Sequence, residues 1–300
     1  MNWLIPALIA PAIYTIVNFV DKYIVSKEVK DYRGMPIYGT IMGFFVGTFF
    51  WVINGFPILP LKDTLIIFAT GAITIWAAAI YFKAISLEDA SNLVIMLQST
   101  PLFTLLFAFL LLGEKITATQ FLGFFLILVA VILVSIEKGK TKMKLSEAFW
   151  LILLVNIMWA ISVVIIKFAI NANSFAEILS YESWGLAIGG ALLYLIFPST
   201  RKAFHHSMRT VRKKALIIMF ANELVFVIAK AITFFAYSIG TASLVSVVGT
   251  TSVFFGILYG LLLTKIFPKF IKEDISRGNL LKKIVGALIL FAGIYLVNYQ

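Results

Sequence analysis

Cysteine is absent from the 300-residue sequence, and histidine occurs only twice, at His205 and His206. Without cysteine, the chain can form no disulfide, no thiolate metal site and no cysteine nucleophile. The sequence also lacks a glycine-rich phosphate-binding loop and an H-E-x-x-H zinc motif. From these absences we expect no metal, no cofactor and no enzymatic activity.

Charged residues are scarce as well. They make up 13% of the chain, whereas hydrophobic residues make up 61% and the mean hydropathy is +1.01. Soluble domains are about one-quarter charged and about half apolar. The apolar excess occurs in blocks of about twenty residues, the length with which a helix crosses the hydrocarbon core of a bilayer. The composition therefore predicts an all-α polytopic membrane protein without a separate soluble domain.

Charged residues, glycine and proline separate the apolar blocks from one another. The break between Leu87 and Ser91 is short, but a single helix from Thr64 to Leu112 would far exceed the thickness of the bilayer. We therefore predict ten transmembrane helices, at residues 3–25, 36–54, 64–85, 91–112, 118–136, 148–170, 177–198, 214–238, 242–264 and 282–299.

Lysine and arginine are distributed unevenly between the two sides of this topology. Most of the 25 Lys and Arg residues lie in or beside the odd-numbered loops, whereas the even-numbered loops contain only Lys62 and Lys115. Because basic residues accumulate on the cytoplasmic side, we expect the odd-numbered loops in the cytoplasm and both termini outside it. The net charge of +11 then indicates orientation in the cell membrane and contact with membrane lipid, and not a nucleic-acid surface.

The two halves of the chain resemble each other. Residues 79–86, AIYFKAIS, align with residues 231–238, AITFFAYS. We therefore divide the chain into two repeats, at residues 1–137 and 148–300, joined by a basic linker at 138–147. Because each repeat has an odd number of spans, the second repeat crosses the membrane in the opposite sense to the first, as in many secondary transporters.

A further set of residues carries a resemblance to a known family. Pro101 in the fourth span is followed by residues 110–114, LLLGE, and then by Thr117, Gln120 and Gly123. This pattern resembles that of the drug/metabolite transporter superfamily, specifically its EamA-like members with ten spans. The resemblance implies that spans one to four and six to nine surround a central cavity, and that spans five and ten lie outside this ring.

The eighth span contains charged residues that are costly to place in a membrane. Asn222 and Glu223 lie near its middle, and Lys230 follows Glu223 by seven residues, so the two charges share one helix face. Such residues usually face the bundle interior or water and often mark a pathway. We expect all three to contact the substrate, with Glu223 as the candidate for proton coupling. The alternative is a structural ion pair that fixes this span to a neighbour.

The first span carries a polar stripe. Tyr14, Asn18 and Asp21 are spaced by four and three residues, which places them on one side of a helix. We expect Tyr14 and Asn18 to bind substrate. Asp21 and Lys22 lie near the predicted cytoplasmic edge, where they form either a gate or an interfacial anchor.

Other polar and aromatic residues within the spans complete the candidate site. Glu182 in the seventh span is placed to pair with Lys230 or Lys167. Pro101 removes a backbone donor and frees the carbonyl near Leu97, so nearby polar side chains are candidates for substrate contacts or for hydrogen bonds between helices. The candidate substrate-binding residues outside spans one and eight are Trp76, Gln98, Ser99, Trp159, Ser162, Glu182, Thr250 and Thr251.

Small residues recur at a spacing of four in several spans. Gly39, Gly43 and Gly47 form one such series, and Gly185 and Gly189 form another. Small residues allow helices to approach closely. They predict packing within the chain or a dimer interface, which leaves both a monomer and a homodimer open.

Together these features predict a secondary active transporter that moves a small organic metabolite, such as an amino acid-like solute, by alternating access. Alternative functions are a flippase for lipid-linked substrates, or a multidrug or cation exporter of the same superfamily. A passive channel fits less well, because duplicated halves with charges in mid-span suit an occluding site. A membrane-embedded enzyme fits least, because the spans contain no cysteine, no histidine and no cluster of nucleophile and base.

Overall fold

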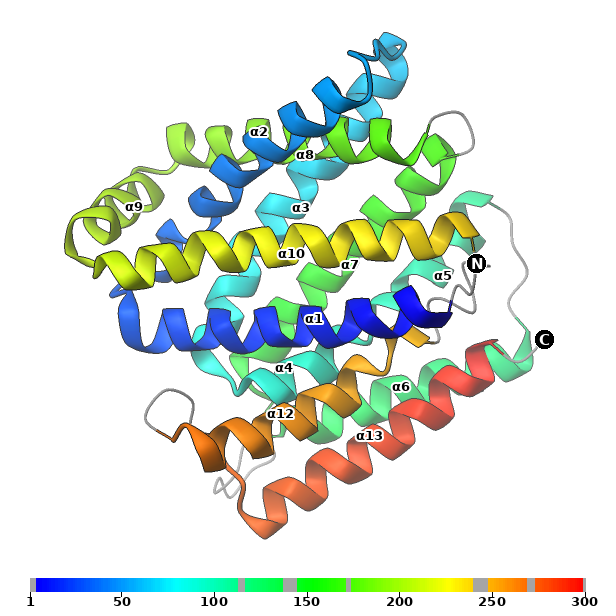
Figure 1. The fold of residues 1–300 in the computed structure, drawn as a ribbon. Helices are drawn as coiled ribbons and strands as arrows, with labels where there is room; N and C mark the ends of the chain where they lie inside the picture. The colour runs from blue at the N-terminus through cyan, green and yellow to red at the C-terminus, as the bar shows by residue number, and fades with distance from the viewer. Residues whose placement is uncertain are drawn as a thin grey trace.

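The computed structural model describes residues 4–112, 117–136, 145–170, 174–239, 248–268 and 273–298, and over these residues the chain is a bundle of helices (Figure 1). Within these ranges no β-strand occurs, and Ile136 and Leu145 form only an isolated bridge. The predicted all-α architecture is confirmed for the described residues.

The helices follow one another with short connections. The first half consists of α1 (Leu4–Tyr23), the π-helical turn η1 (Ile24–Glu28), the 3-10 turn η2 (Tyr32–Gly34), α2 (Pro36–Ile53), α3 (Leu61–Leu87), α4 (Ala90–Leu97), α5 (Thr100–Leu112) and α6 (Ala118–Ser135). The second half consists of α7 (Glu147–Ile170), α8 (Phe175–Ile196), α9 (Pro198–Thr210), α10 (Lys213–Ile239), α12 (Ser252–Ile266) and α13 (Arg277–Asn298).

Local sequence signals explain where two of these helices begin. Thr117 accepts a hydrogen bond from the backbone of Gln120, and the Gln120 side chain accepts one from the backbone of Thr117. Ser174 and Glu177 form the same reciprocal arrangement at the start of α8. Such capping boxes satisfy backbone donors that the first helical turn leaves free. Two residues of the family pattern, Thr117 and Gln120, thus have a structural role.

Several helices have the length and polarity of membrane spans. Seven of the described helices, beginning with Leu4–Glu28 and ending with Arg277–Leu296, are long and apolar enough to cross a bilayer, and α12 is a shorter apolar helix. On the outer surface, Phe45 is 61% exposed, whereas Glu182 is buried. This arrangement, with large apolar side chains outside and ionisable groups inside, is that of a polytopic membrane protein.

The helices pack in pairs that join the two halves. α1 packs against α10, α3 packs against α7 and α8, α2 packs against α8, and α6 packs against α13. In Figure 1 the pair α6 and α13 lies along one edge of the bundle and α2 lies at the opposite edge. The end of α1, helix α9 and the end of α12 lie toward the left of this view, and the start of α1 and the end of α13 lie toward the right.

Glycines sit where these helices approach most closely. A Cβ atom on Gly43 would lie 2.8 Å from Leu186 Cδ2, and one on Gly185 would lie 2.6 Å from Phe68 Cα. A Cβ on Gly189 would lie 2.6 Å from Ala72 Cα. The predicted packing role of these glycines within the chain is therefore confirmed, at the contacts of α8 with α2 and α3.

The span predicted at residues 91–112, with a kink at Pro101, is interrupted more strongly than expected. α4 and α5 are separated by a turn at Gln98 and Ser99. Proline at 101 contributes to the break, because it lacks the backbone donor that would bond the Leu97 carbonyl. The Thr100 hydroxyl donates to the Leu97 carbonyl at 2.8 Å, which satisfies the acceptor that was expected to be free.

The ninth span shows a related break. α12 begins only at Ser252, after a turn at Thr250 and Thr251, whereas the prediction placed one helix over 242–264. Its first residues, 242–247, lie outside the described residues. The Thr251 hydroxyl donates to the Val248 carbonyl at 2.7 Å and so supports the turn without a proline.

The loop predicted between residues 198 and 214 contains a helix, α9, that the hydropathy pattern did not indicate. Pro198 occupies its first turn, a position that proline favours because its missing donor is not needed there. Charged residues keep the average hydropathy of α9 low, so it was not recognised as an element.

Candidate functional site

A cluster of polar side chains lies where α1, α3 and α10 meet. Asp21 Oδ1 accepts a hydrogen bond from Asn222 Nδ2 at 2.8 Å. The Tyr81 hydroxyl lies 3.1 Å from Asp21 Oδ2 and 2.9 Å from Asn18 Oδ1, and donates its proton to one of them. Asp21 is 5% exposed and Asn222 is 6% exposed. We call Asn18, Asp21, Tyr81, Asn222 and the adjacent Glu223 the carboxyl cluster.

Glu223 adds a second carboxyl group to this cluster. It is close enough to Asp21 for the two groups to interact electrostatically. A Cβ on Gly39 would lie 3.1 Å from Glu223 Oε2, so glycine at this position leaves room for the carboxyl group. Among the described residues, Glu223 has no hydrogen-bond or ion-pair partner for its side chain. It is therefore available to a proton or a ligand.

Lys230 does not pair with Glu223. Its ammonium group forms a buried ion pair with Glu182 of α8, and the two side chains are 11% and 2% exposed. A spacing of seven residues separates Glu223 and Lys230 by about 10 Å along α10, which is too far for direct contact. For Lys230, the structure thus has the ion pair to a neighbouring span that was the alternative to a substrate contact. The prediction that Glu182 pairs with Lys230 is confirmed, and the side chain of Lys167 lies outside the described residues.

The two helix breaks are held by residues from the opposite half of the chain. Asn156 of α7 donates to Met96 O at 2.9 Å and to Ser99 Oγ at 2.6 Å. On the other side, the Thr15 hydroxyl of α1 lies 3.3 Å from Ser252 O at the start of α12, and 2.7 Å from Pro11 O of its own helix. Gln98 Nε2 donates to Ser252 Oγ at 2.9 Å and so connects one break to the other.

The remaining candidates differ in whether their polar atoms have partners. Trp76 donates to Gly189 O at 3.0 Å, so it joins α3 to α8 and has a structural contact. Trp159 lies beside Tyr81, with ring centres 6.3 Å apart, and its buried Nε1 has no hydrogen-bond partner among the described residues. Ser162 is buried next to Thr70.

Tyr14 adds an aromatic ring near the cluster. Its ring meets Phe226 of α10 edge to face, with ring centres 5.6 Å apart. Since α1 and α10 also carry Asp21 and Glu223, the same two helices present both aromatic and carboxyl groups. Sequence reasoning placed Tyr14 and Asn18 correctly on one stripe but missed Tyr81, although residue 81 lies within the repeated segment 79–86.

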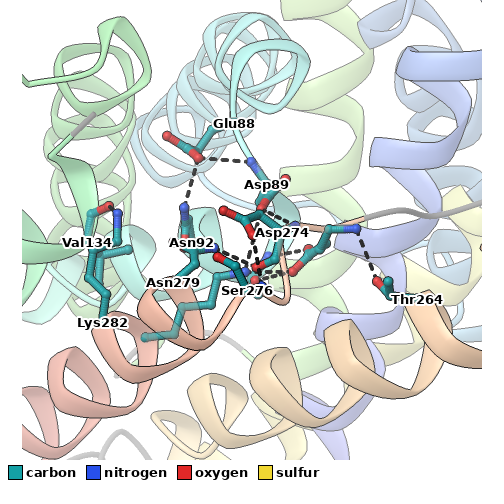
Figure 2. A network of polar contacts seen from close by, with 12 residues as sticks. Glu88, Asp89, Asn92, Val134, Thr264, Asp274, Ser276, Asn279 and Lys282 are labelled. Atoms are coloured by element: carbon teal, nitrogen blue, oxygen red, sulfur yellow. Dashed lines mark hydrogen bonds and ion pairs between the residues drawn. The ribbon is translucent and has the colours of Figure 1, made fainter. Parts of the chain in front are cut away.

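A second polar network lies at the start of α4 (Figure 2). The Glu273 carboxylate accepts from Ser91 N at 3.0 Å, from the Ser91 hydroxyl, and from Lys283 Nζ at 2.9 Å. Asp89 also lies 3.6 Å from Lys283 Nζ and accepts from Asp274 N. We call Asp89, Ser91, Glu273, Asp274 and Lys283 the Glu273 network.

The Glu273 network joins the first half of the chain to the second. Glu273 and Lys283 are 5% and 3% exposed, so their charges neutralise each other in a buried position. Lys22 donates to Ile85 O at 2.8 Å and is close enough to Asp89 and Glu273 to interact electrostatically. Asp21 and Lys22, predicted together as either a gate or an interfacial anchor, thus contribute to different sites. The sequence did not indicate Glu273, because it lies outside the apolar spans.

No metal centre is built from these residues. Over the described ranges, no group of three or more His, Asp or Glu side chains could hold a metal ion. The buried polar groups instead mostly pair with one another, whereas the partly buried Glu223 carboxyl and the buried Trp159 Nε1 have no partner among the described residues. Buried ionisable groups within an apolar helical bundle mark candidate functional sites of membrane proteins.

Comparison with known proteins identifies the family. Residues 1–136 match the EamA-like transporter family. The match covers 136 of the 300 residues, and it confirms the resemblance to the drug/metabolite transporter superfamily. Residues 113–116 of the quoted pattern, which include Glu114, lie outside the described residues.

Solved structures extend the similarity to both halves of the chain. There are 27 matching chains among them. One of these, titled "Crystal structure of protein", has 16% sequence identity and a TM-score of 0.60, and the match covers 97% of this chain and 95% of that chain. At this identity the likeness concerns the fold alone. A search of curated proteins finds no match.

Proposed function

We propose that the protein is a secondary active transporter that carries a small organic solute across the cell membrane by alternating access. The single observation that carries this proposal is the pair of carboxyl groups, Asp21 and Glu223, in the interior of a bundle of membrane-spanning helices. Ionisable groups in such positions are costly and mark pathways for substrates or protons.

The pattern of helix contacts supports two inverted repeats, residues 1–137 and 148–300. In the two repeats, α1 corresponds to α7 and α3 corresponds to α10, so the contact of α1 with α10 is the counterpart of the contact of α7 with α3. Likewise α2 corresponds to α8 and α6 corresponds to α13, and each of these helices packs against its own counterpart. The hydrogen bonds of Asn156 and Thr15 to the two helix breaks are exchanged as well. We count α4 with α5, and the turn at 248–251 with α12, as one span each, which gives ten spans.

The carboxyl cluster favours a solute that carries an amino group. Two nearby carboxyl groups repel each other when both are ionised, so a proton or an ammonium group between them lowers the energy. The rings of Tyr14 and Phe226 add a surface that attracts cations. The unpaired Nε1 of Trp159 offers a donor for an acceptor group of the same solute. An amino acid-like metabolite has both groups, and Glu223 would couple its transport to protons.

The Glu273 network would close the end of the bundle at which the odd-numbered loops lie. It links α4 to the segment before α13, which belong to different repeats. Alternating access requires such contacts to break when this end opens. We place this end in the cytoplasm because of its basic residues, with both termini on the outside.

Replacement of Glu223 by glutamine tests the proposal. Glu223→Gln keeps the shape of the side chain but removes its charge, so we expect it to abolish solute uptake in proteoliposomes or to uncouple uptake from the pH gradient. Counterflow over a panel of amino acids, amines, sugars and nucleotides would identify the solute.

The control for this experiment is Glu147→Gln, which removes only an exposed ion pair with Lys83 and should transport normally. Full uptake with unaltered pH dependence in Glu223→Gln would remove Glu223 from the mechanism. Flux without saturation or counterflow would favour a channel, and movement of lipid-linked substrates alone would favour a flippase.

A further inference from the structure

Helix α9 is fixed to the bundle by one face. The Tyr38 hydroxyl and Ser207 Oγ form a hydrogen bond of 2.8 Å, and a Cβ on Gly34 would lie 2.6 Å from Phe204 N. Ala203 and Ser207 are buried on this face. The helix is therefore not a mobile loop, and its opposite face has a defined position at the end of the bundle.

The opposite face is basic. A surface depression of about 440 Å³ is lined by Arg201, Lys202, His205, His206 and Arg209. All five side chains are exposed, and no acidic residue lines the depression. Arginine and lysine side chains gathered around one concavity are suited to an anionic oxygen group such as a phosphate.

Helix α8 orders two of these side chains. The Tyr194 hydroxyl lies 2.7 Å from His205 Nε2, and the Arg201 guanidinium carbon lies 6.0 Å from the centre of the Tyr194 ring. A cation over an aromatic ring is attracted to its face. The depression is thus partly organised before a ligand arrives.

The nearest carboxylate does not neutralise this surface. Asp31 is close enough to His206 to interact electrostatically, but its carboxylate forms an ion pair of 2.8 Å with Arg33. Burial raises the pKa of Asp31, but the hydrogen bonds from the side chain and backbone of Arg33 outweigh this effect, so the pKa lies below its usual value. The charges of Asp31 and Arg33 cancel each other, and the basic side chains of α9 keep their own charge.

Apolar side chains border the basic face. Leu195, Ile196 and Phe197 at the end of α8 are 65%, 56% and 41% exposed, and Met208 of α9 is 41% exposed. In a membrane-spanning bundle, exposed apolar residues at the end of a span face the acyl chains just below the headgroups. A free nucleic acid or a soluble anion would make no use of this apolar border.

We propose that α9 is a binding site for the phosphate headgroups of anionic phospholipids in the adjoining leaflet, with Arg201 and Arg209 as the phosphate contacts and the end of α8 against the acyl chains. The site would anchor α9, and with it the connection between α8 and α10, to the membrane surface. Its location agrees with a cytoplasmic leaflet, which is rich in anionic lipid, but its chemistry does not depend on the transport mechanism.

Binding can be measured by native mass spectrometry of the purified protein with phosphatidylglycerol or phosphatidylcholine. We expect the intact chain to retain phosphatidylglycerol in preference, and Arg201→Gln/Arg209→Gln to reduce this affinity about tenfold or more. The charge-preserving variant Arg201→Lys/Arg209→Lys should retain most of the binding. The matched control Lys62→Gln/Lys265→Gln, which removes two exposed charges elsewhere, should bind as the unaltered protein does.

Competition with inorganic phosphate separates a lipid site from a site for free anions. We expect phosphate at matched concentration not to displace phosphatidylglycerol, because it lacks acyl chains. Equal displacement by phosphate, or equal loss of lipid in the Lys62/Lys265 control, would overturn the proposal. Thermal unfolding in phosphatidylcholine should be the same for all variants. If the glutamine double variant unfolds early, the single variants Arg201→Gln and Arg209→Gln take its place, and each should bind less phosphatidylglycerol than the Lys62→Gln/Lys265→Gln control.

Discussion

At the scale of single residues, the buried ion pair between Lys230 and Glu182 is the clearest case of mutual dependence. Lys230→Met removes the cation but leaves the Glu182 carboxylate buried without a partner. Breaking a buried pair in this way costs about 3–5 kcal/mol. We expect a lower free energy of unfolding for Lys230→Met, measured by thermal or denaturant unfolding in detergent micelles.

The double variant Lys230→Met/Glu182→Gln is the control for this prediction. It removes both charges, so most of the lost stability should return. If the single and double variants are equally unstable, the loss is one of packing by the lysine side chain and not of charge balance.

Residue identities in the site were only partly predictable. The spacing of Tyr14, Asn18 and Asp21 placed them on one stripe of α1, and Asn18 and Asp21 both contact Tyr81. The partners of Asp21 could not be predicted, because Tyr81 and Asn222 come from α3 and α10, and a single sequence does not specify which helices meet. By contrast, the sequence offered Glu182 as a partner for Lys230, and the structure forms this ion pair between α8 and α10.

At the scale of helices, the glycines between α3 and α8 determine how closely these helices pack. A Cβ on Gly71 would collide with the Glu182 carbonyl oxygen and lie 2.8 Å from Gly185 C. We expect Gly71→Ala to separate the two helices and to lower the free energy of unfolding by about 1–3 kcal/mol. Thermal unfolding in detergent would measure this change.

Gly278→Ala is a suitable comparison for Gly71→Ala. Gly278 lies in the first turn of α13, and an added Cβ there has no neighbouring atom within 4 Å. It should leave stability unchanged or raise it slightly, because alanine has the higher helix propensity. Equal effects of the two substitutions would show that α3 and α8 can adjust to the added methyl group.

Most helix positions followed from apolar blocks of sufficient length, because the hydrocarbon core requires them. Two features did not. The basic residues of α9 concealed a helix whose buried face is short and partly polar, with Thr200, Ala203 and Ser207 inward. The break before Thr100 was foreseen only as a kink, because proline explains the freed carbonyl but not the hydrogen bonds from Asn156 that hold the turn.

At the scale of the whole molecule, each half of the chain contacts the interrupted helix of the other half. Asn156 of the second half supports the break in the first half, and Thr15 of the first half contacts the first residue of α12, directly after the turn. A change in the relative position of the halves would therefore alter both breaks together. This coupling is what the proposed alternating access requires of its two repeats.

The Glu273 network provides the last test at this scale. Because the chain contains no cysteine, the variant Ser91→Cys/Glu273→Cys would carry only the two introduced thiols. Ser91 contacts the end of the longer Glu273 side chain, and a disulfide needs Cβ atoms about 3.8 Å apart, so mass spectrometry has to verify the bond before transport is measured. Oxidation should join α4 to the segment before α13 and prevent this end of the bundle from opening. We expect transport in proteoliposomes to stop on oxidation and to return on reduction.

The comparison is made between the oxidised and reduced forms of the same variant, so the loss of the Glu273 charge affects both equally. Each single-cysteine variant, treated with the same oxidant, should show no change in rate. Since a covalent bond between the two repeats blocks only motions that separate them here, binding of solute from the opposite side should persist in the oxidised form. Unchanged transport after complete oxidation would mean that α4 and the segment before α13 move as one body, and that the gate lies elsewhere.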